Sequence, residues 1–123
     1  WNALTTVHAN TARDALSRIE NMVSMTGIQF PTKGLRSQIA SAINVVIQVE
    51  RQEDGRRRIV SISEINGMES EVITMSELFK FERRGVDKDG GVIGTLKATG
   101  IIPSFQQQIL RKGIDLPVEL FAE

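Results

Sequence analysis

The sequence predicts an α/β fold with a mixed sheet, and three features of its pattern point to it. Residues 3–8 are rich in Thr and Val, which favour an extended backbone, and this run stops where a helical pattern starts. Residues 12–26 then repeat apolar side chains at helical spacing. After a second helical stretch the apolar period changes to two, and turn-forming residues divide the rest of the chain into four β-patterned runs.

The first helix has recognisable boundary signals. Thr11, followed three residues later by Asp14, is a weak capping box before it, and Gly27 is a natural stop after it. The polar face of this helix carries four charged side chains: Arg13, Asp14, Arg18 and Glu20. We expect that face to be solvated, with local ion pairs of small energetic weight.

A second helix and a hairpin are expected next. The helix begins after Pro31, with Thr32 as its N-cap. From Ile43 to Glu50 apolar side chains alternate with polar ones except at Val46, which predicts a strand with both faces partly covered. Asp54-Gly55 is a hairpin turn signal, and the returning strand is expected over residues 57–65.

The next part of the chain has the pattern of a second hairpin. Asn66-Gly67-Met68 predicts a turn, and residues 71–81 predict a strand, with one helical turn over Ser76–Phe79 as the alternative. Residues 86–91 are expected to form a loop before a strand at 92–99. The spacing of two aspartates in that loop is also that of an EF-hand, but the later calcium ligands are missing, so a hairpin turn is the preferred interpretation.

The chain is expected to end in a short helix and a folded-back tail. Pro103 and Ser104 precede a helical stretch over residues 105–112, which Gly113 ends. The apolar residues after it are expected to fold back over the core.

Composition limits the kinds of function. The 123 residues are enough for one domain with a hydrophobic core. Lys plus Arg and Asp plus Glu are balanced at 15 each, so no overall charge attracts nucleic acid or anionic lipid. The absence of cysteine excludes disulfides and thiolate metal sites. No apolar run reaches the length of a membrane span.

Arg56-Arg57-Arg58 is the densest basic patch. Charges beside a hairpin tip protect a sheet edge from aggregation, which is the preferred interpretation. A contact with a nucleotide or a partner protein is the alternative. Nucleic-acid binding through this patch is disfavoured, because the chain is neutral and aromatic residues make up only 5% of it.

His8 is the single histidine of the chain, and it is a candidate functional residue. It lies at the carboxyl end of the first expected strand, next to the start of a helix. Ligands of α/β proteins commonly bind at such positions.

The residues around His8 resemble the histidine box of the secretion ATPases. These are the ring-forming motors of type II and type IV secretion and of tight-adherence (Flp-type) pilus assembly, and the pilus-assembly branch is the most similar. The resemblance starts with Thr5–Asn10 and Arg13–Glu20. It continues in the same order through five further stretches: Gln38–Val46, Asp54–Arg58, Glu64–Glu69, Ala98–Ile101 and Gly113–Pro117.

The resemblance implies a fold and a function. Residues 1–123 would be a single domain, the C-terminal portion of a RecA-like P-loop NTPase domain, with a mixed sheet and an antiparallel C-terminal extension. The parent would be a hexameric ATPase that couples ATP hydrolysis to substrate secretion or pilus assembly. Its partners would be its own ring and inner-membrane platform proteins, at the cytoplasmic side of the inner membrane, and no nucleic acid is expected.

The resemblance also implies roles for three residues. His8 would lie near the nucleotide γ-phosphate and sense its presence through a hydrogen bond. Thr6 and Asn10 would orient the imidazole from beside it. A role for His8 as general base is less favoured, because phosphoryl transfer depends mostly on positioning and electrostatics. The polar face of the first helix would then be the place of a subunit contact.

The chain lacks the Walker A motif of these motors, Gly-x-x-x-x-Gly-Lys-Ser/Thr. ATP and Mg²⁺ would therefore be cofactors of the full-length parent and not of this chain alone, which we do not expect to hydrolyse ATP. The alternative is a non-catalytic interaction module that binds secretion-system subunits.

Overall fold

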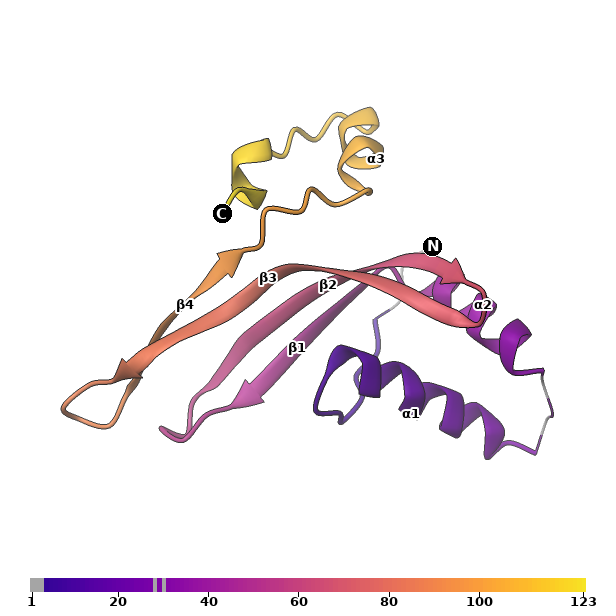
Figure 1. Ribbon diagram of the computed structural model, residues 1–123, viewed down its shortest axis with the longest axis horizontal. Coiled ribbons are helices and arrows are strands. Elements are labelled where there is room, and N and C mark those ends of the chain that lie inside the picture. Colours follow the sequence, from indigo (N-terminus) through magenta and orange to yellow (C-terminus); the bar gives the residue numbers. More distant parts are fainter. Residues whose placement is uncertain (1–3, 28, 30) are drawn as a thin grey trace.

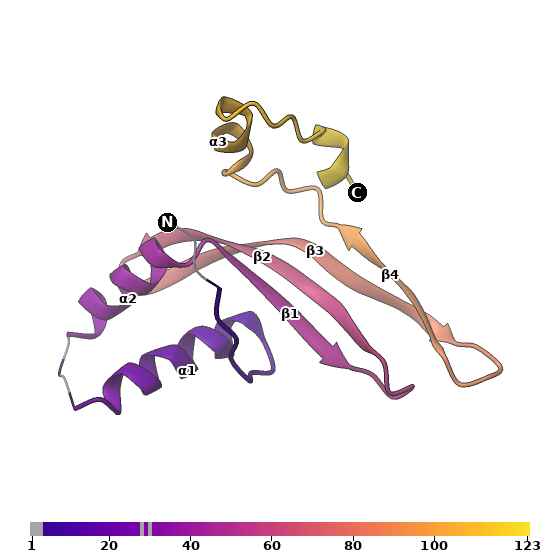
Figure 2. The same ribbon diagram turned by 180° about the vertical axis from the view of Figure 1, so that it is seen from behind.

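The computed structural model of this protein describes residues 4–27, 29 and 31–123. Four strands form one sheet in sequence order: β1 (Val45–Arg51), β2 (Arg57–Glu69), β3 (Val72–Val86) and β4 (Val92–Ala98). Two helices lie on one side of this sheet (Figure 1): α1 (Ala12–Ser24) and α2 (Thr32–Ala42). The C-terminal segment lies on the other side, as the reverse view in Figure 2 also shows, and contains α3 (Gln106–Arg111) and the 3-10 helix η1 (Val118–Phe121).

This architecture corrects the predicted fold class, the C-terminal portion of a RecA-like P-loop NTPase domain with a mixed sheet. All three strand pairs of the described sheet are antiparallel. The physical reason is the length of the connections, because short turns join each strand to the next and a parallel pair needs a crossover of a dozen or more residues. The small antiparallel sheet therefore replaces the mixed one.

The strand predicted at residues 3–8 is also wrong for the described residues, and residue 3 lies outside them. Residues 4–9 have no regular secondary structure. A strand requires a ladder of backbone hydrogen bonds with a neighbour, whereas among the described residues β1 pairs only with β2. The Gln48 side chain provides a single link by donating a hydrogen bond of 2.9 Å to the carbonyl oxygen of Ala9.

The core lies between the two helices and the sheet. Its buried side chains come from both helices, β2 and β3: Leu16, Leu35, Ile39, Ile65 and Ile73. The predicted first helix is confirmed, and the hydroxyl oxygen of Thr11 caps it by accepting a hydrogen bond from the Asp14 N–H at 3.0 Å. The second helix is confirmed too, but Thr32 is its first helical residue and not its N-cap, which is Pro31.

The hairpin turn at Asp54-Gly55 is confirmed, because the Gly55 N–H donates a hydrogen bond to the Gln52 carbonyl oxygen at 2.9 Å. The turn predicted at Asn66-Gly67-Met68 is wrong, since β2 continues through it to Glu69. Gly67 has a φ of 147° at an irregularity in the β2–β3 register. Glycine adopts this backbone angle easily, so it allows a bulge inside the strand. Ser76–Phe79 belongs to β3 and is not a helical turn.

The C-terminal segment folds back as expected, but onto the face of the sheet opposite the helices and their core (Figure 1 and Figure 2). Phe121 is 5% exposed, and its ring centroid lies 5.9 Å from that of Phe79 in β3. The short helix predicted over residues 105–112 is confirmed as α3. Within the described ranges, no helix has the length and apolar content of a membrane span.

Candidate functional site

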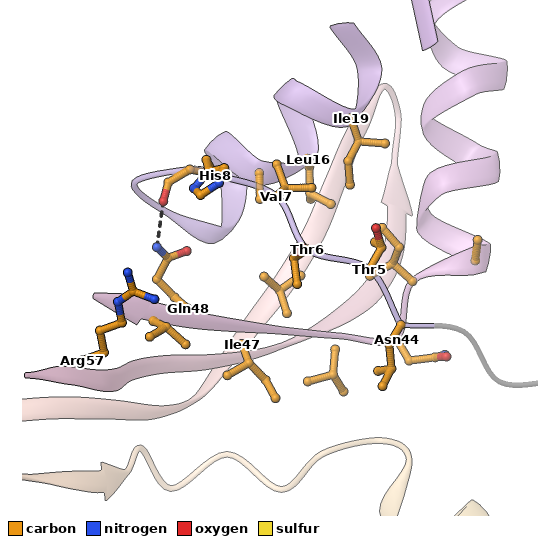
Figure 3. Close-up of a pocket in the computed structure, with 18 of the residues that line it drawn as sticks. Thr5, Thr6, Val7, His8, Leu16, Ile19, Asn44, Ile47, Gln48 and Arg57 are labelled. Atoms are coloured by element: carbon orange, nitrogen blue, oxygen red, sulfur yellow. Dashed lines mark hydrogen bonds between the residues drawn. The ribbon is translucent and has the colours of Figure 1, made fainter. Parts of the chain in front are cut away.

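A groove lies beside the outer edge of β1. Its volume is about 940 Å³, and its walls come from residues 4–9, the inner face of α1 and β1 itself. Figure 3 shows residues Thr5 to His8 running alongside β1 in the same direction as that strand. Because β2 pairs with β1 on its other side, the groove follows a sheet edge that no strand among residues 4–27, 29 and 31–123 covers.

The segment that carries His8 is held in place at its carboxyl end, by Ala9 and Asn10. At its carboxyl end, Asp14 accepts a hydrogen bond from the backbone N–H of Asn10 at 3.2 Å and forms an ion pair of 3.0 Å with Arg18. The hydrogen bond from Arg18 and then the Asn10 N–H lower the pKa of the Asp14 carboxyl group. The Gln48–Ala9 hydrogen bond attaches the same segment to β1. His8 therefore directly precedes two anchored residues, Ala9 and Asn10.

His8 itself is exposed and lines the groove. No hydrogen bond or ion pair joins its ring to any other described residue. Both imidazole nitrogens are thus available to a ligand, one as a donor and the other as an acceptor in the neutral ring. The structure places this residue where it can contact a bound molecule.

The other two predicted site residues are separated from each other. Thr6 is exposed and lines the same groove as His8. Asn10 lines a different hollow of about 360 Å³, together with polar residues of β2 and β3 that include Ser63 and Glu77. The structure thus brings Thr6 and His8 together and does not place Asn10 in their groove.

Two arginines join this site: Arg51, which sequence reasoning missed, and Arg57, which it considered for a nucleotide or partner contact only as the alternative within the basic patch. Arg51 at the end of β1 and Arg57 at the start of β2 both line the groove, and Figure 3 shows Arg57 at the same end as Gln48 and His8. The Asp54-Gly55 turn signal could have indicated this, because a hairpin around it brings residues 51 and 57 opposite each other. The groove has no Asp or Glu in its lining.

The three arginines of the basic patch, Arg56, Arg57 and Arg58, have different roles. Arg58 is structural, since its guanidinium contacts the Asp54 carboxylate at 2.9 Å and 3.1 Å and the Gln52 side-chain oxygen at 2.8 Å. These contacts with Arg58, followed by the Val92 N–H, hold the pKa of Asp54 well below its usual range. Arg56 is exposed and lies outside the groove, so only Arg57 of the three faces it.

The polar face of α1 contacts the rest of the chain. Arg13 donates a hydrogen bond to the Ile73 carbonyl oxygen at 3.0 Å. Glu20 forms an ion pair with Arg36 of α2 at 3.0 Å. This face therefore combines local ion pairs with contacts to α2 and β3.

The loop between β3 and β4 is a hairpin turn. The Asp87 carboxylate accepts hydrogen bonds from the N–H groups of Asp89 and Gly91, at 2.9 Å and 2.7 Å. Among the residues that the structure describes, no group of three or more His, Cys, Asp or Glu side chains could hold a metal ion. The hydrogen bonds of Asp87 with Asp89 and Gly91 confirm the turn interpretation of this loop.

Comparison with known proteins gives one line of similarity. No family model matches the chain. The chain is 34% identical over 67 residues to a protein of Mycobacterium tuberculosis strain CDC 1551 / Oshkosh described as a "Putative conjugal transfer protein", and equally to its counterpart in strain H37Rv. The match covers 54% of this chain and 18% of each relative, so the chain spans less than a fifth of the length of these curated relatives. The chain is thus similar to part of a putative conjugal transfer protein.

Proposed function

We propose that this chain acts as the C-terminal segment of a motor ATPase that drives conjugal transfer or a related secretion or pilus-assembly process. Two observations of different kinds support the proposal: the similarity to a conjugal transfer protein and the resemblance of residues 5–20 to a histidine box. The observation that carries it is the position of His8, exposed in a groove that has cationic residues and no carboxylate in its lining.

In this proposal the chain responds to ATP hydrolysis and does not perform it. It has no Walker A motif, so ATP and Mg²⁺ would be bound by another part of the protein. His8 would donate a hydrogen bond to a γ-phosphate oxygen, or to a water beside it, and so sense whether that phosphate is present. Thr6 would support the imidazole within the groove, and Asn10 would do so only after a rearrangement of its segment.

The surroundings of the protein are part of the same proposal. The parent would assemble as a homo-oligomeric ring, contact platform proteins of the inner membrane and work on the cytoplasmic side of that membrane. No nucleic acid is required as a partner of this chain, whose formal net charge is zero.

The test uses the full-length protein that contains this chain. We expect His8→Ala to leave ATP binding within about twofold and to lower turnover by about tenfold or more, because removing one transition-state hydrogen bond has effects of this size or larger. Ser37→Ala, at an exposed position of α2, is the matched control and should change neither quantity. Unchanged turnover and unchanged secretion in the His8→Ala protein would contradict the proposal.

A non-catalytic interaction module is the second candidate, and the open edge of β1 favours it. Ile47 and Val49 in that strand are 56% and 51% exposed, and exposed apolar residues beside an unpaired edge are suited to binding another protein strand. Ile47→Lys would then abolish binding to secretion-system subunits and leave ATP turnover of the complex unchanged. A loss of turnover without a loss of binding would favour the motor proposal.

A further inference from the structure

We propose that Arg51, Arg57 and His8 form a binding site for the phosphate groups of a small molecule that lies along the groove. This inference deepens the proposed function and rests on it for the role of His8, because it names further groups that would hold a phosphate. The arginines themselves are inferred from their geometry.

The two arginines are held opposite each other. Arg51 and Arg57 are register partners in the β1–β2 ladder, so they occupy one face of the sheet with Cβ atoms about 5 Å apart. Two like charges in this arrangement repel each other and destabilise the hairpin. An anion between them would remove the repulsion, and a guanidinium group matches a phosphate with two parallel hydrogen bonds.

Several other arginines of the chain are neutralised by carboxylates, whereas in the described structure Arg51 and Arg57 are not. Four are in ion pairs with carboxylates: Arg18, Arg36, Arg58 and Arg83. Within the part of the chain that the structure describes, neither Arg51 nor Arg57 has a hydrogen bond or an ion pair from its side chain. Since their groove also lacks an acidic residue, its end remains positively charged although the whole chain is neutral.

His8 approaches the same end from the opposite wall. Gln48 binds the carbonyl oxygen of the residue after His8, and it lies three residues before Arg51 in β1, or about 10 Å along the strand. The long arginine side chains can span much of this separation. A ligand with more than one phosphate could therefore contact the imidazole and both guanidinium groups together.

The rest of the groove limits the size and polarity of the ligand. A volume of about 940 Å³ is suited to a nucleotide-sized molecule. Apolar side chains such as Val7, Ile47 and Val49 line its length, so the part of the ligand away from the phosphates should be less polar. A nucleoside triphosphate and the headgroup of an anionic lipid share this chemistry.

The experiment measures binding to the full chain at physiological salt, in two arms. The first titrates ATP and tripolyphosphate by calorimetry, and the second uses phosphatidylcholine vesicles with and without phosphatidylglycerol. The test variant is R51Q/R57Q. The control is R56Q, which removes one arginine charge from an exposed position of the same hairpin, outside the groove. Circular dichroism establishes that each variant is folded.

We expect R51Q/R57Q to weaken binding by about tenfold or more, either to the free polyphosphates or to the anionic vesicles, depending on which of them the site binds. R56Q should change the same binding by less than about twofold. His8→Ala should weaken binding to a smaller extent. If R51Q/R57Q loses binding to ATP and tripolyphosphate, the ligand is a free polyphosphate. If it loses binding to the vesicles with phosphatidylglycerol, the ligand is a lipid headgroup. Equal losses in R56Q and R51Q/R57Q, or no binding in either arm, would overturn the site.

This outcome is separable from that of the proposed function. Binding that depends on Arg51 and Arg57, with normal turnover of the full-length His8→Ala protein, would keep the site and remove the motor role. Absent binding, with turnover that depends on His8, would remove the site and keep the motor role.

Discussion

The hydroxyl of Ser104 donates a hydrogen bond of 2.5 Å to the carboxylate of Glu64, a residue of β2 that is only 5% exposed. The same carboxylate accepts the backbone N–H groups of Ser104 at 3.0 Å and of Phe105 at 3.2 Å. A buried carboxylate requires such donors, because burial removes its hydration. Glu64 therefore fixes the start of the C-terminal segment on the sheet.

Ser104→Ala should lower the free energy of unfolding by about 1.5–3 kcal/mol, the range for hydrogen bonds to charged groups. Ser61→Ala is the matched control, because it removes a similar bond of 2.7 Å to Glu77 at an exposed position. That change should cost less than about 0.5 kcal/mol. Urea titration followed by circular dichroism measures both, and equal losses would show that the Glu64 contact has no special weight.

A second prediction concerns acid. The pKa of Asp54 is held well below its usual range by Arg58 and then by the Val92 N–H, which donates to its carboxylate at 3.0 Å. A lowered pKa in the folded state means that the unfolded state binds the proton more tightly, so stability falls as pH drops below the ordinary carboxyl value of about 3.9. The contribution of Asp54 is complete at neutral pH and is lost progressively in acid.

We therefore expect Asp54→Asn to be less stable than the natural protein at pH 7 and the difference to shrink steadily below about pH 4. Thermal unfolding measured from pH 7 to pH 2 tests this. Asp89→Asn, at an exposed position of the other hairpin, is the control and should show no such convergence. A difference for Asp54→Asn that is independent of pH would contradict the assigned role of its charge.

Local signals in the sequence predicted much of the fold. Thr11 and the apolar spacing after it predicted α1, and Asp54-Gly55 predicted the first hairpin, because caps and turns depend on a few neighbouring residues. The class of the sheet could not be read in this way. Whether residues 4–9 form a strand depends on a neighbour with free hydrogen-bonding groups in register, which no local pattern contains.

The same limit applies to the candidate site. His8 was predicted as a site residue because it is the single histidine of the chain, and Thr6 lies with it in the groove. Asn10 is two residues further on but lines another hollow, since the chain turns there to start α1. Arg51 and its pairing with Arg57 were missed because their proximity arises from strand register and not from adjacency in sequence.

Two glycines should respond in opposite ways to alanine. A Cβ on Gly94 in β4 would clash with the Phe81 ring and lie 2.6 Å from the carbonyl oxygen of Glu82, which belongs to the backbone and cannot move aside. Gly94→Ala should therefore destabilise the protein by about 1–3 kcal/mol. Gly34 in α2 has open space around it, and Gly34→Ala should stabilise by about 0.5–1 kcal/mol because alanine favours a helix. Urea titration measures the free energy of unfolding of both variants. An unchanged stability of Gly94→Ala would contradict the packing of β4 on β3.

The last prediction concerns the attachment of α1, which forms one wall of the groove. Leu16 is 3% exposed and belongs to the core cluster with Leu35, Ile39, Ile65 and Ile73. Leu16→Ala removes buried methyl groups and leaves a cavity, so we expect a loss of about 2–5 kcal/mol in the free energy of unfolding. Met22 on the same helix is 50% exposed, and Met22→Ala should cost less than about 1 kcal/mol.

Because Leu16 also lines the groove, its truncation should weaken ligand binding as well as stability, whereas Met22→Ala should leave binding unchanged. Equal effects of the two substitutions would mean that α1 is not docked through Leu16.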